Sequence, residues 1–335
     1  MLKELCMLNG TSGREHSVRD FIISKIPADC EYTVDRLGNI ICEKKGRNRA
    51  KNKVMLSAHM DEVGFIITYI TDDGMLKFST VGGIDERVIF GRSVTLQSGV
   101  HGVIGSKAFH QLSSEEREKV PPVDELYIDI GADSKKEAQK YVNLGDSAYF
   151  DSEYIEFGDG FVKAKAIDDR AGCMMLLELL NSEVEYDLSV AFVVQEEIGT
   201  RGSGVAAFNI KPDYAIVLES TTASDIPDTP DNKTVCRLGG GAVVSYMDRG
   251  TVYDFELYKK AFEIAEKNGI KCQTKTVVAG GNDAAAIHKS GVGVRTTAIS
   301  IPTRYIHSPS SVAKLEDIES VKRLAFIMAQ ELANA

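Results

Sequence analysis

The sequence contains no tryptophan, although its 335 residues include 13 phenylalanines and 12 tyrosines. Polysaccharide clefts usually stack sugar rings on aromatic faces, so this absence argues against a glycoside hydrolase. The G-x-S-x-G motif is also missing, which argues against a serine hydrolase. Glycines at 199–204 and 239–241 do not have the G-x-G-x-x-G spacing, so a nucleotide-binding loop is not indicated either.

Basic residues are outnumbered, with 39 Lys and Arg against 49 Asp and Glu and a net charge of −10. We therefore expect neither nucleic acid nor an anionic membrane as a partner. No apolar run is long enough to span a membrane, and Met1–Leu8 lacks the apolar core of a signal peptide. The six cysteines form no C-x-x-C pair, as is typical of buried thiols in a reducing compartment. We expect a cytoplasmic protein.

Predicted strands and helices alternate in two parts of the chain, residues 1–63 and 158–335, which indicates one α/β domain that is split in sequence. Residues 64–157 instead contain short β-runs separated by Gly and Asp turns, so we predict an inserted β-rich domain. Its helical candidates are Ser113–Lys119 and Ser134–Asn143. The strands expected in the α/β part include Val54–Ala58, Leu188–Val194, Tyr214–Leu218, Lys271–Val278 and Val294–Ile301.

Two adjacent carboxylates, Asp168 and Asp169, stand between a short β-run and an apolar run with helical spacing. A carboxylate at a helix start is often only an N-cap, so the pair alone does not specify chemistry. Three further stretches place histidine or carboxylate at the polar end of an apolar run, at residues 58–62, 195–197 and 305–309. Together they supply ligands for two metal ions sharing one carboxylate, and Asp168 is our candidate for that bridge.

The histidine candidates each have a local reason to ligate. His59 and Asp61 come at the end of a predicted strand and are two residues apart, so they share one face. The Asp61 carboxylate can then bond to the imidazole N–H and orient the ring. His307 lies in a loop that the downstream Pro309 restricts.

The glutamate candidates follow apolar strands. Glu196 and Glu197 come directly after a buried-looking strand, where unpaired charge is expensive. Because adjacent side chains diverge, one can bind a metal while the other acts as a general base. Glu219 likewise ends the apolar run Ile216–Leu218.

Five motifs occur in order: AHMDEVGF (58–65), AIDDRAGC (166–173), VVQEEIGTRGS (193–203), GGNDAAAIHKSGVGV (280–294) and ISIPTRYIHSP (299–309). The sequence resembles, over essentially its whole length, the glutamyl/deblocking aminopeptidase family. The resemblance implies a cytoplasmic dinuclear-metal exopeptidase that forms hollow tetrahedral particles, dodecamers built from dimers. It also implies a mixed-sheet α/β/α catalytic domain of the zinc-peptidase type, with the insertion as a PDZ-like domain that makes subunit contacts.

The resemblance implies five metal ligands and two catalytic carboxylates. The implied ligands are His59 and Glu219 for one ion, Glu197 and His307 for the other, and Asp168 as the bridge. The implied catalytic residues are Glu196 as general base and Asp61 as the acid that orients His59. A cis peptide bond between Asp168 and Asp169 is implied as well, and residues 220–222 and 280–283 are expected to line the substrate pocket.

Zinc is the first expectation for the two divalent ions, and cobalt or manganese suits the same donors. The substrates implied are peptides with a free N-terminus, and acidic, basic and aliphatic first residues all stay open. The alternative function is a metal-dependent deacylase or aminoacylase acting on N-acyl amino acids. An endoglucanase, a label that some family members carry, is a weaker alternative, because glycosidase carboxylates need no histidine partners. A purely structural metal is disfavoured, since structural zinc sites use closed Cys/His sets.

Overall fold

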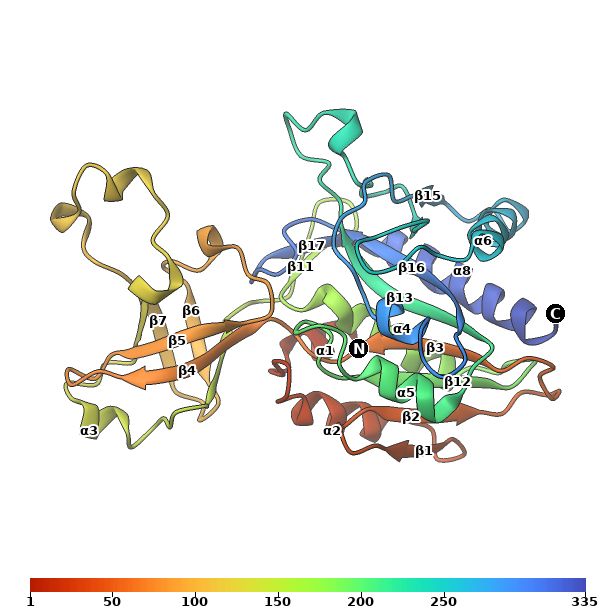
Figure 1. Ribbon diagram of the computed structural model, residues 1–335, viewed down its shortest axis with the longest axis horizontal. Coiled ribbons are helices and arrows are strands. Elements are labelled where there is room, and N and C mark those ends of the chain that lie inside the picture. The colour runs from red at the N-terminus through yellow and green to blue at the C-terminus, as the bar shows by residue number, and fades with distance from the viewer.

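A computed structural model describes all 335 residues (Figure 1). Its central element is a mixed sheet of eight strands. In spatial order these strands are β1 (Glu31–Val34), β2 (Ile40–Lys44), β12 (Leu188–Val193), β3 (Val54–His59), β13 (Tyr214–Thr222), β16 (Arg295–Thr303), β14 (Ala242–Val244) and β15 (Cys272–Thr274). The four central strands, β12, β3, β13 and β16, run parallel, and antiparallel pairs flank them at β2 and β14.

Helices cover both faces of this sheet, which is why β3 and β12 are buried along their whole length. Along β3, Leu56 faces the core shared with α4 (Ile167–Leu180) and α8 (Leu315–Ala333). Its neighbour Met55 faces the opposite core, with α5 (Ser203–Ile210) and α7 (Ala284–Ile287). The remaining helices contribute to the α4 side: α1 (Leu2–Met7), α2 (His16–Lys25) and α6 (Phe255–Lys267). The predicted mixed α/β fold is therefore confirmed.

The chain between β3 and β10 forms a closed six-stranded barrel that stands to one side of the main sheet (Figure 1). Its strands are β4 (Gly64–Ile70), β5 (Leu76–Val81), β6 (Ser93–Leu96), β7 (His101–Gly105), β8 (Tyr127–Asp129) and β9 (Ser147–Phe150). The barrel has its own core, in which the Phe65 ring makes edge contacts with Phe78 at 5.0 Å and Phe150 at 4.9 Å. A separate core is the property expected of an inserted domain.

A third, small sheet joins β10 (Ile155–Phe157), β11 (Phe161–Ala164) and β17 (Ser311–Lys314). This sheet aligns the chain just before Asp168 with the chain just after His307. The division into 1–63 plus 158–335 and 64–157 stays a prediction. The pairing of β10 with β11 favours an end of the insertion shortly before Ile155.

Several predicted elements differ in extent. Strand β13 runs on to Thr222, so Glu219 lies inside a strand and not at its end. In the barrel, Ser113–Lys119 contains only a 3₁₀ turn, and α3 (Lys135–Ala138) is shorter than predicted. The predicted strand 271–278 is paired over β15 alone, because the chain then turns toward the cavity described below. None of the helices combines the length and apolarity needed to cross a membrane.

Candidate active site

The seven residues that we predicted for the site converge beyond the carboxyl ends of the parallel strands, where open α/β sheets form their clefts. Each comes from a different position in the fold. His59 ends β3, Asp61 follows it, Glu196 and Glu197 follow β12, Glu219 lies in β13, Asp168 lies in the first turn of α4, and His307 lies between β16 and β17. Residues more than 100 positions apart in the sequence thus share one site.

Asp168 stands between the two histidines and presents one oxygen to each. Its Oδ1 lies 3.2 Å from His59 Nε2, and its Oδ2 lies 3.3 Å from His307 Nε2. On the outer sides, Glu219 Oε1 lies 3.4 Å from His59 Nε2, and Glu197 Oε2 lies 3.3 Å from His307 Nε2. The arrangement has two halves that share Asp168.

These separations fit metal ligands. Ligands about 2.0–2.1 Å from a tetrahedral zinc ion are about 3.3–3.4 Å from one another. Donor atoms of His59, Asp168 and Glu197 all lie within 4.8 Å of one another, as do those of His59, Asp169 and Glu219. The donor set is nitrogen and carboxylate oxygen, which zinc, cobalt and manganese accept.

The charge balance of the site also calls for cations. Glu219 Oε2 is buried and has no hydrogen-bond partner. Burial raises the pKa of Glu219 well above its usual range, and raises that of Glu197 to about 8. For His307, burial would lower the pKa, but Asp168 and Glu197 raise it to about 9. Buried carboxylates in excess of histidines are costly without a positive partner, and divalent ions would supply it.

Both imidazoles are oriented through Nδ1, which leaves Nε2 facing Asp168. His59 Nδ1 lies 3.1 Å from the Asp61 carbonyl oxygen and 3.4 Å from Asp61 Oδ1. His307 Nδ1 lies 2.7 Å from the carbonyl oxygen of Gly83, which follows barrel strand β5. A partner on the second nitrogen is the usual way to fix the ring of a metal-binding histidine. The barrel therefore contributes directly to the site.

The Asp61 carboxylate forms hydrogen bonds that the sequence did not predict, in addition to its contact with His59. It is fully buried, and its Oδ1 accepts the backbone N–H of Glu196 at 3.0 Å. Its Oδ2 accepts the N–H of Glu197 at 3.1 Å and the hydroxyl of Ser12 at 2.6 Å. Asp61 thus holds the backbone of both glutamates as well as lying beside His59.

The two adjacent aspartates have different surroundings. The peptide bond between Asp168 and Asp169 is cis, as the resemblance implied. Asp169 Oδ1 accepts the N–H of Gly172 at 3.0 Å, and its Oδ2 accepts that of His59 at 3.3 Å. The N-cap interpretation therefore describes Asp169, while Asp168 faces the histidines.

Glu196 lies at the edge of a cavity of about 140 Å³, which Asp168, Glu197, Glu219 and His307 also line. Burial raises the pKa of Glu196 well above its usual range, and the lowering effect of His59 does not offset it. A carboxylate with a raised pKa that borders a cavity is suited to proton transfer near neutral pH.

Sequence reasoning missed three contributors. Ser12 and Gly83 act through contacts that only the fold reveals, and Lys275, which lines the cavity, carried no sequence signal. Asp283 is fully buried, neither of its oxygens has a hydrogen-bond partner, and burial raises its pKa to about 6. Residues 220–222 and 280–282 line the cavity as expected, whereas Asp283 is not among the lining residues.

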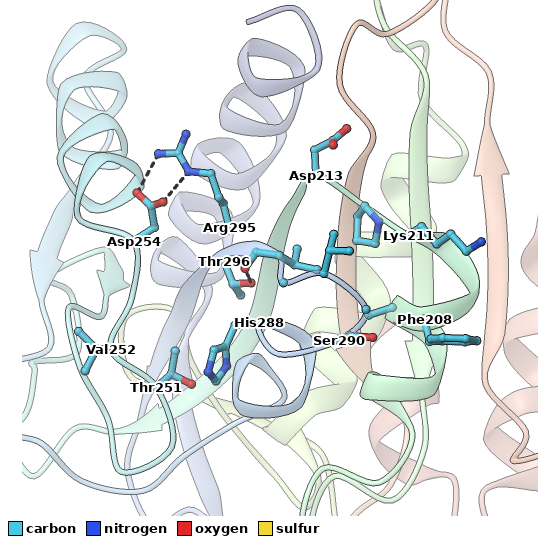
Figure 2. A pocket seen from close by; sticks show the side chains of 16 residues that line it. Phe208, Lys211, Asp213, Thr251, Val252, Asp254, His288, Ser290, Arg295 and Thr296 are labelled. Carbon is cyan, nitrogen blue, oxygen red and sulfur yellow. Dashed lines mark hydrogen bonds and ion pairs between the residues drawn. The ribbon is translucent and has the colours of Figure 1, made fainter.

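A second and larger cavity, of about 810 Å³, lies at the opposite ends of the same strands (Figure 2). Two bonds engage three of its four charged side chains: Arg295 Nε donates to Asp254 Oδ2 at 2.6 Å, and Asp213 accepts the backbone N–H of Lys53 at 2.8 Å. The fourth, Lys211, forms no ion pair. His288 Nδ1 lies 2.7 Å from the carbonyl oxygen of Ala284. This cavity has no convergent set of metal-binding or catalytic groups.

Known proteins resemble the chain over nearly its whole length. Residues 38–324 match the family described as M42 glutamyl aminopeptidase. A putative aminopeptidase of Acetivibrio thermocellus is 38% identical over 328 residues, which cover 97% of this chain and 96% of that protein. The lysyl aminopeptidase of Pyrococcus furiosus is 31% identical over 344 residues (99% and 96%), and the glutamyl aminopeptidase of Lactococcus lactis is 30% identical over 329 residues (94% and 91%).

Solved structures of other proteins are also similar to this chain. An aminopeptidase from the archaeon Desulfurococcus kamchatkensis superposes with a TM-score of 0.93 at 35% identity, covering 98% of this chain and 93% of that chain. PhTET1-12s, solved as a dodecamer, gives 0.87 at 37% identity (99% and 98%). A Thermotoga maritima protein described as an endoglucanase gives 0.82 at 39% identity (99% and 97%). The chain therefore belongs to the M42 glutamyl aminopeptidase family, whose members are metal-dependent aminopeptidases.

Proposed function

We propose that this protein removes single residues from peptides with a free N-terminus, using two divalent metal ions and Glu196 as the general base. The observation that carries the proposal is Asp168, whose two oxygens each face a different histidine. One ion would be held by His59, Asp168 and Glu219, and the other by His307, Asp168 and Glu197. Zinc is our first choice for both ions.

When bound, such ions lower the pKa of water and polarise the scissile carbonyl group. The rest of the mechanism belongs to this chain's own residues. Glu196, at the edge of the cavity, accepts the proton of the attacking water and then gives it to the leaving amine. Asp61 keeps Glu196 in position through the backbone N–H, and its contact with His59 keeps that imidazole turned toward Asp168.

The acidic surroundings also support the exopeptidase assignment. A protonated α-amine is attracted to a site with this many carboxylates, whereas an acetylated N-terminus has no charge to offer. The deacylase alternative would need a pocket that accepts the acyl group, and a small cavity bordered by acids is a poor match for one. The endoglucanase alternative is weaker still, because glycosidase carboxylates need no histidine partners, whereas Asp168 faces two histidines.

We further propose that the protein assembles into a homo-oligomer, a dodecamer built from dimers; PhTET1-12s was solved as a dodecamer. The barrel, for which we keep the PDZ-like description, would make part of the subunit contacts. Light scattering on the purified protein tests this proposal, and a monomeric mass would contradict it. We also place the protein in the cytoplasm, since all six cysteines are free thiols and five are buried.

The decisive experiment uses one set of short peptides with free and N-acetylated termini, each incubated with metal-loaded and chelated protein. We expect single residues to be released from free peptides only, and only when metal is present. Cleavage of the acetylated set instead would move the assignment to the deacylases.

A further inference from the structure

Glu15 is a buried glutamate to which the proposed mechanism gives no role. It stands directly before α2, and only 6% of its surface is exposed. Its Oε1 accepts the backbone N–H of Gly13 at 2.7 Å and that of Gln195 at 3.1 Å. Because Gln195 comes directly before Glu196, this carboxylate reaches the loop of the proposed general base across 180 positions of sequence.

The bond to Gln195 is not a by-product of helix capping. A glutamate at a helix start usually stabilises that helix, through its free N–H groups or its dipole. The side chain of Glu15 caps no N–H group of α2 and turns instead to Gly13 and Gln195. Burial raises the pKa of Glu15 above its usual range, so a charged carboxylate is costly at this position. The position is therefore better explained by what the carboxylate holds than by α2.

Three consecutive backbone N–H groups follow β12, and each donates to a buried carboxylate. Gln195 donates to Glu15, Glu196 donates to Asp61 Oδ1 at 3.0 Å, and Glu197 donates to Asp61 Oδ2 at 3.1 Å. The φ of Gln195 is 58°, a left-handed conformation that non-glycine residues adopt only when their surroundings enforce it. Successive N–H groups in such a turn point to one side and form a concavity that binds anions. Here the anions are two side chains of the protein itself.

Glu15 is held in place by the segment that precedes it. The N–H of Gly10 donates to Glu62 Oε1 at 2.9 Å, and the carbonyl oxygen of Gly10 accepts the N–H of Glu62 at 3.0 Å. Ser12 donates its hydroxyl to Asp61. This segment is thus fixed to the chain that follows β3, so the carboxylate of Glu15 has a defined position from which to hold the loop after β12.

We propose that Glu15 is a positioning residue for the general base: its bond to the N–H of Gln195 keeps Gln195 left-handed and thereby fixes the direction in which the Glu196 side chain meets the cavity. This inference rests on the proposed role of Glu196. Without the bond, Gln195 is free to return to a negative φ, which rotates the peptide unit that leads into Glu196. The N–H of Glu196 stays with Asp61, so the base is misdirected and not released. A displacement of about 1 Å at a catalytic group can lower the rate by about 100-fold.

Two substitutions separate the reach of the Glu15 side chain from its charge. Glu15→Gln removes the charge and keeps an oxygen at the same distance from the backbone, whereas Glu15→Asp keeps the charge and is shorter by one methylene group. The experiment measures kcat and KM separately for one unblocked peptide at saturating metal.

We expect Glu15→Asp and Glu15→Ala to lower kcat by roughly 10- to 100-fold, the effect of a misplaced catalytic group. KM and bound metal should stay unaltered, because Glu15 belongs neither to the cavity wall nor to the metal cluster. Glu15→Gln should retain most of kcat. The reverse order, with Glu15→Asp active and Glu15→Gln inactive, would show that a negative charge is needed and not a hydrogen bond, and would overturn the proposal. A fall in bound metal in Glu15→Ala would place the effect on the metal ligands and would overturn it as well.

Ile22→Ala is the control for stability. Ile22 is buried in α2, and truncating it leaves a cavity where the helix packs on the main core. We expect Ile22→Ala to lower the melting temperature at least as much as Glu15→Ala and to leave kcat near its original value. Equal losses of kcat in the two variants would mean that Glu15 acts only through the stability of the N-terminal region, and the inference would be wrong.

A double variant connects Glu15 to the base. In Glu196→Gln there is no base to position, so adding Glu15→Ala should lower the residual kcat by far less than it does in the unaltered protein. A full additional loss would show that Glu15 acts on another group, and would overturn its role while leaving Glu196 as the base. Normal turnover by Glu196→Gln would overturn both the base assignment and this inference. No turnover of any peptide by the metal-loaded protein would overturn the aminopeptidase function, and the inference with it.

Discussion

The two ends of the central sheet carry two cavities with opposite properties. The larger one, of about 810 Å³, is bordered by the surface ion pair of Arg295 with Asp254. The smaller one, of about 140 Å³, is bordered by buried groups that lack partners, among them Glu219 Oε2 and the Ser220 hydroxyl. By volume alone, the larger cavity would be the candidate binding site. The buried polar groups without hydrogen-bond partners indicate the smaller cavity instead.

The difference follows from free energy. Around the larger cavity, the buried polar atom without a hydrogen-bond partner is the uncharged hydroxyl of Thr251, and an ion pair at the surface joins Arg295 to Asp254. Around the smaller cavity, folding forces several carboxylates together out of water, which is unfavourable until cations arrive. The smaller cavity is therefore the place where ligand binding and stability should be coupled. Ligand binding and stability should not be coupled at the larger cavity.

Removal of metal should have the largest effect. We expect chelation to abolish peptide hydrolysis and to lower the melting temperature by about 5–10 °C, since ions held at 100 times their dissociation constant contribute about 2.7 kcal/mol. Calorimetry of loaded, chelated and reloaded protein measures the change. An identical melting curve for loaded and chelated protein would mean that the buried carboxylates are stable without ions. The smaller cavity would then not couple ligand binding to stability, and the two cavities would not differ in this property.

Glu196→Gln should come next, with a fall in kcat of about 10²- to 10⁴-fold, the usual contribution of a general base. Because Glu196 is not among our proposed ligands, the bound metal measured by atomic absorption should equal that of the unaltered protein. Gln also keeps the shape of the side chain. Substantial surviving turnover, or a loss of metal, would remove Glu196 from the role of base.

Asp61→Asn should produce a smaller loss, of about 10- to 100-fold in kcat, as for other residues that orient a metal-binding or catalytic group. Asn retains one oxygen for the two backbone N–H groups of Glu196 and Glu197, but it puts an N–H₂ where the other is accepted. Ser12→Ala removes one further bond to the same carboxylate and should cost less. Both losses are measured as kcat and KM at saturating metal. A larger loss for Asp61→Asn than for Ser12→Ala would show that the Asp61 carboxylate, and not its bond to Ser12, holds the backbone of Glu196 and Glu197.

The sequence predicted which histidines and carboxylates lie together around Asp168: the candidates came from apolar runs that end in such residues, and their ligand roles came from the family resemblance. The sequence did not predict the backbone conformations that orient these side chains. His307 and Gln195 adopt left-handed backbone conformations, with φ of 59° and 58°, which non-glycine residues adopt only when their surroundings enforce them. Neither conformation has a signal in local sequence.

Hydrogen-bond partners that are distant in the sequence could not be predicted either. The carbonyl oxygen of Gly83 reaches His307 from the barrel, across 224 positions of sequence. Backbone carbonyls are present at every residue, so no pattern marks the one that will be used. Lys275 was missed for a related reason: one lysine after a short strand is ordinary, and only its burial and lack of a counter-ion distinguish it.

The smallest effect is expected at the larger cavity. Phe208 and Val292 lie on its rim and are 61% and 107% exposed. The double variant Phe208→Ser/Val292→Ser should change stability by no more than about 0.5 kcal/mol, as exposed substitutions usually do. Its kcat/KM for a free peptide should stay within about twofold of the unaltered protein. Steady-state kinetics and a melting curve for the same preparation measure both quantities.

A large loss of activity in that double variant would be informative, because a physical connection between the cavities exists. Thr251 lines the larger cavity and donates its N–H to Asp248, which accepts the hydroxyl of Tyr253. Asn282, on the wall of the smaller cavity, donates to that same hydroxyl at 3.0 Å. Normal kinetics would show that this chain of bonds is only structural, whereas altered KM with normal metal content would show that it transmits changes between the two ends of the sheet.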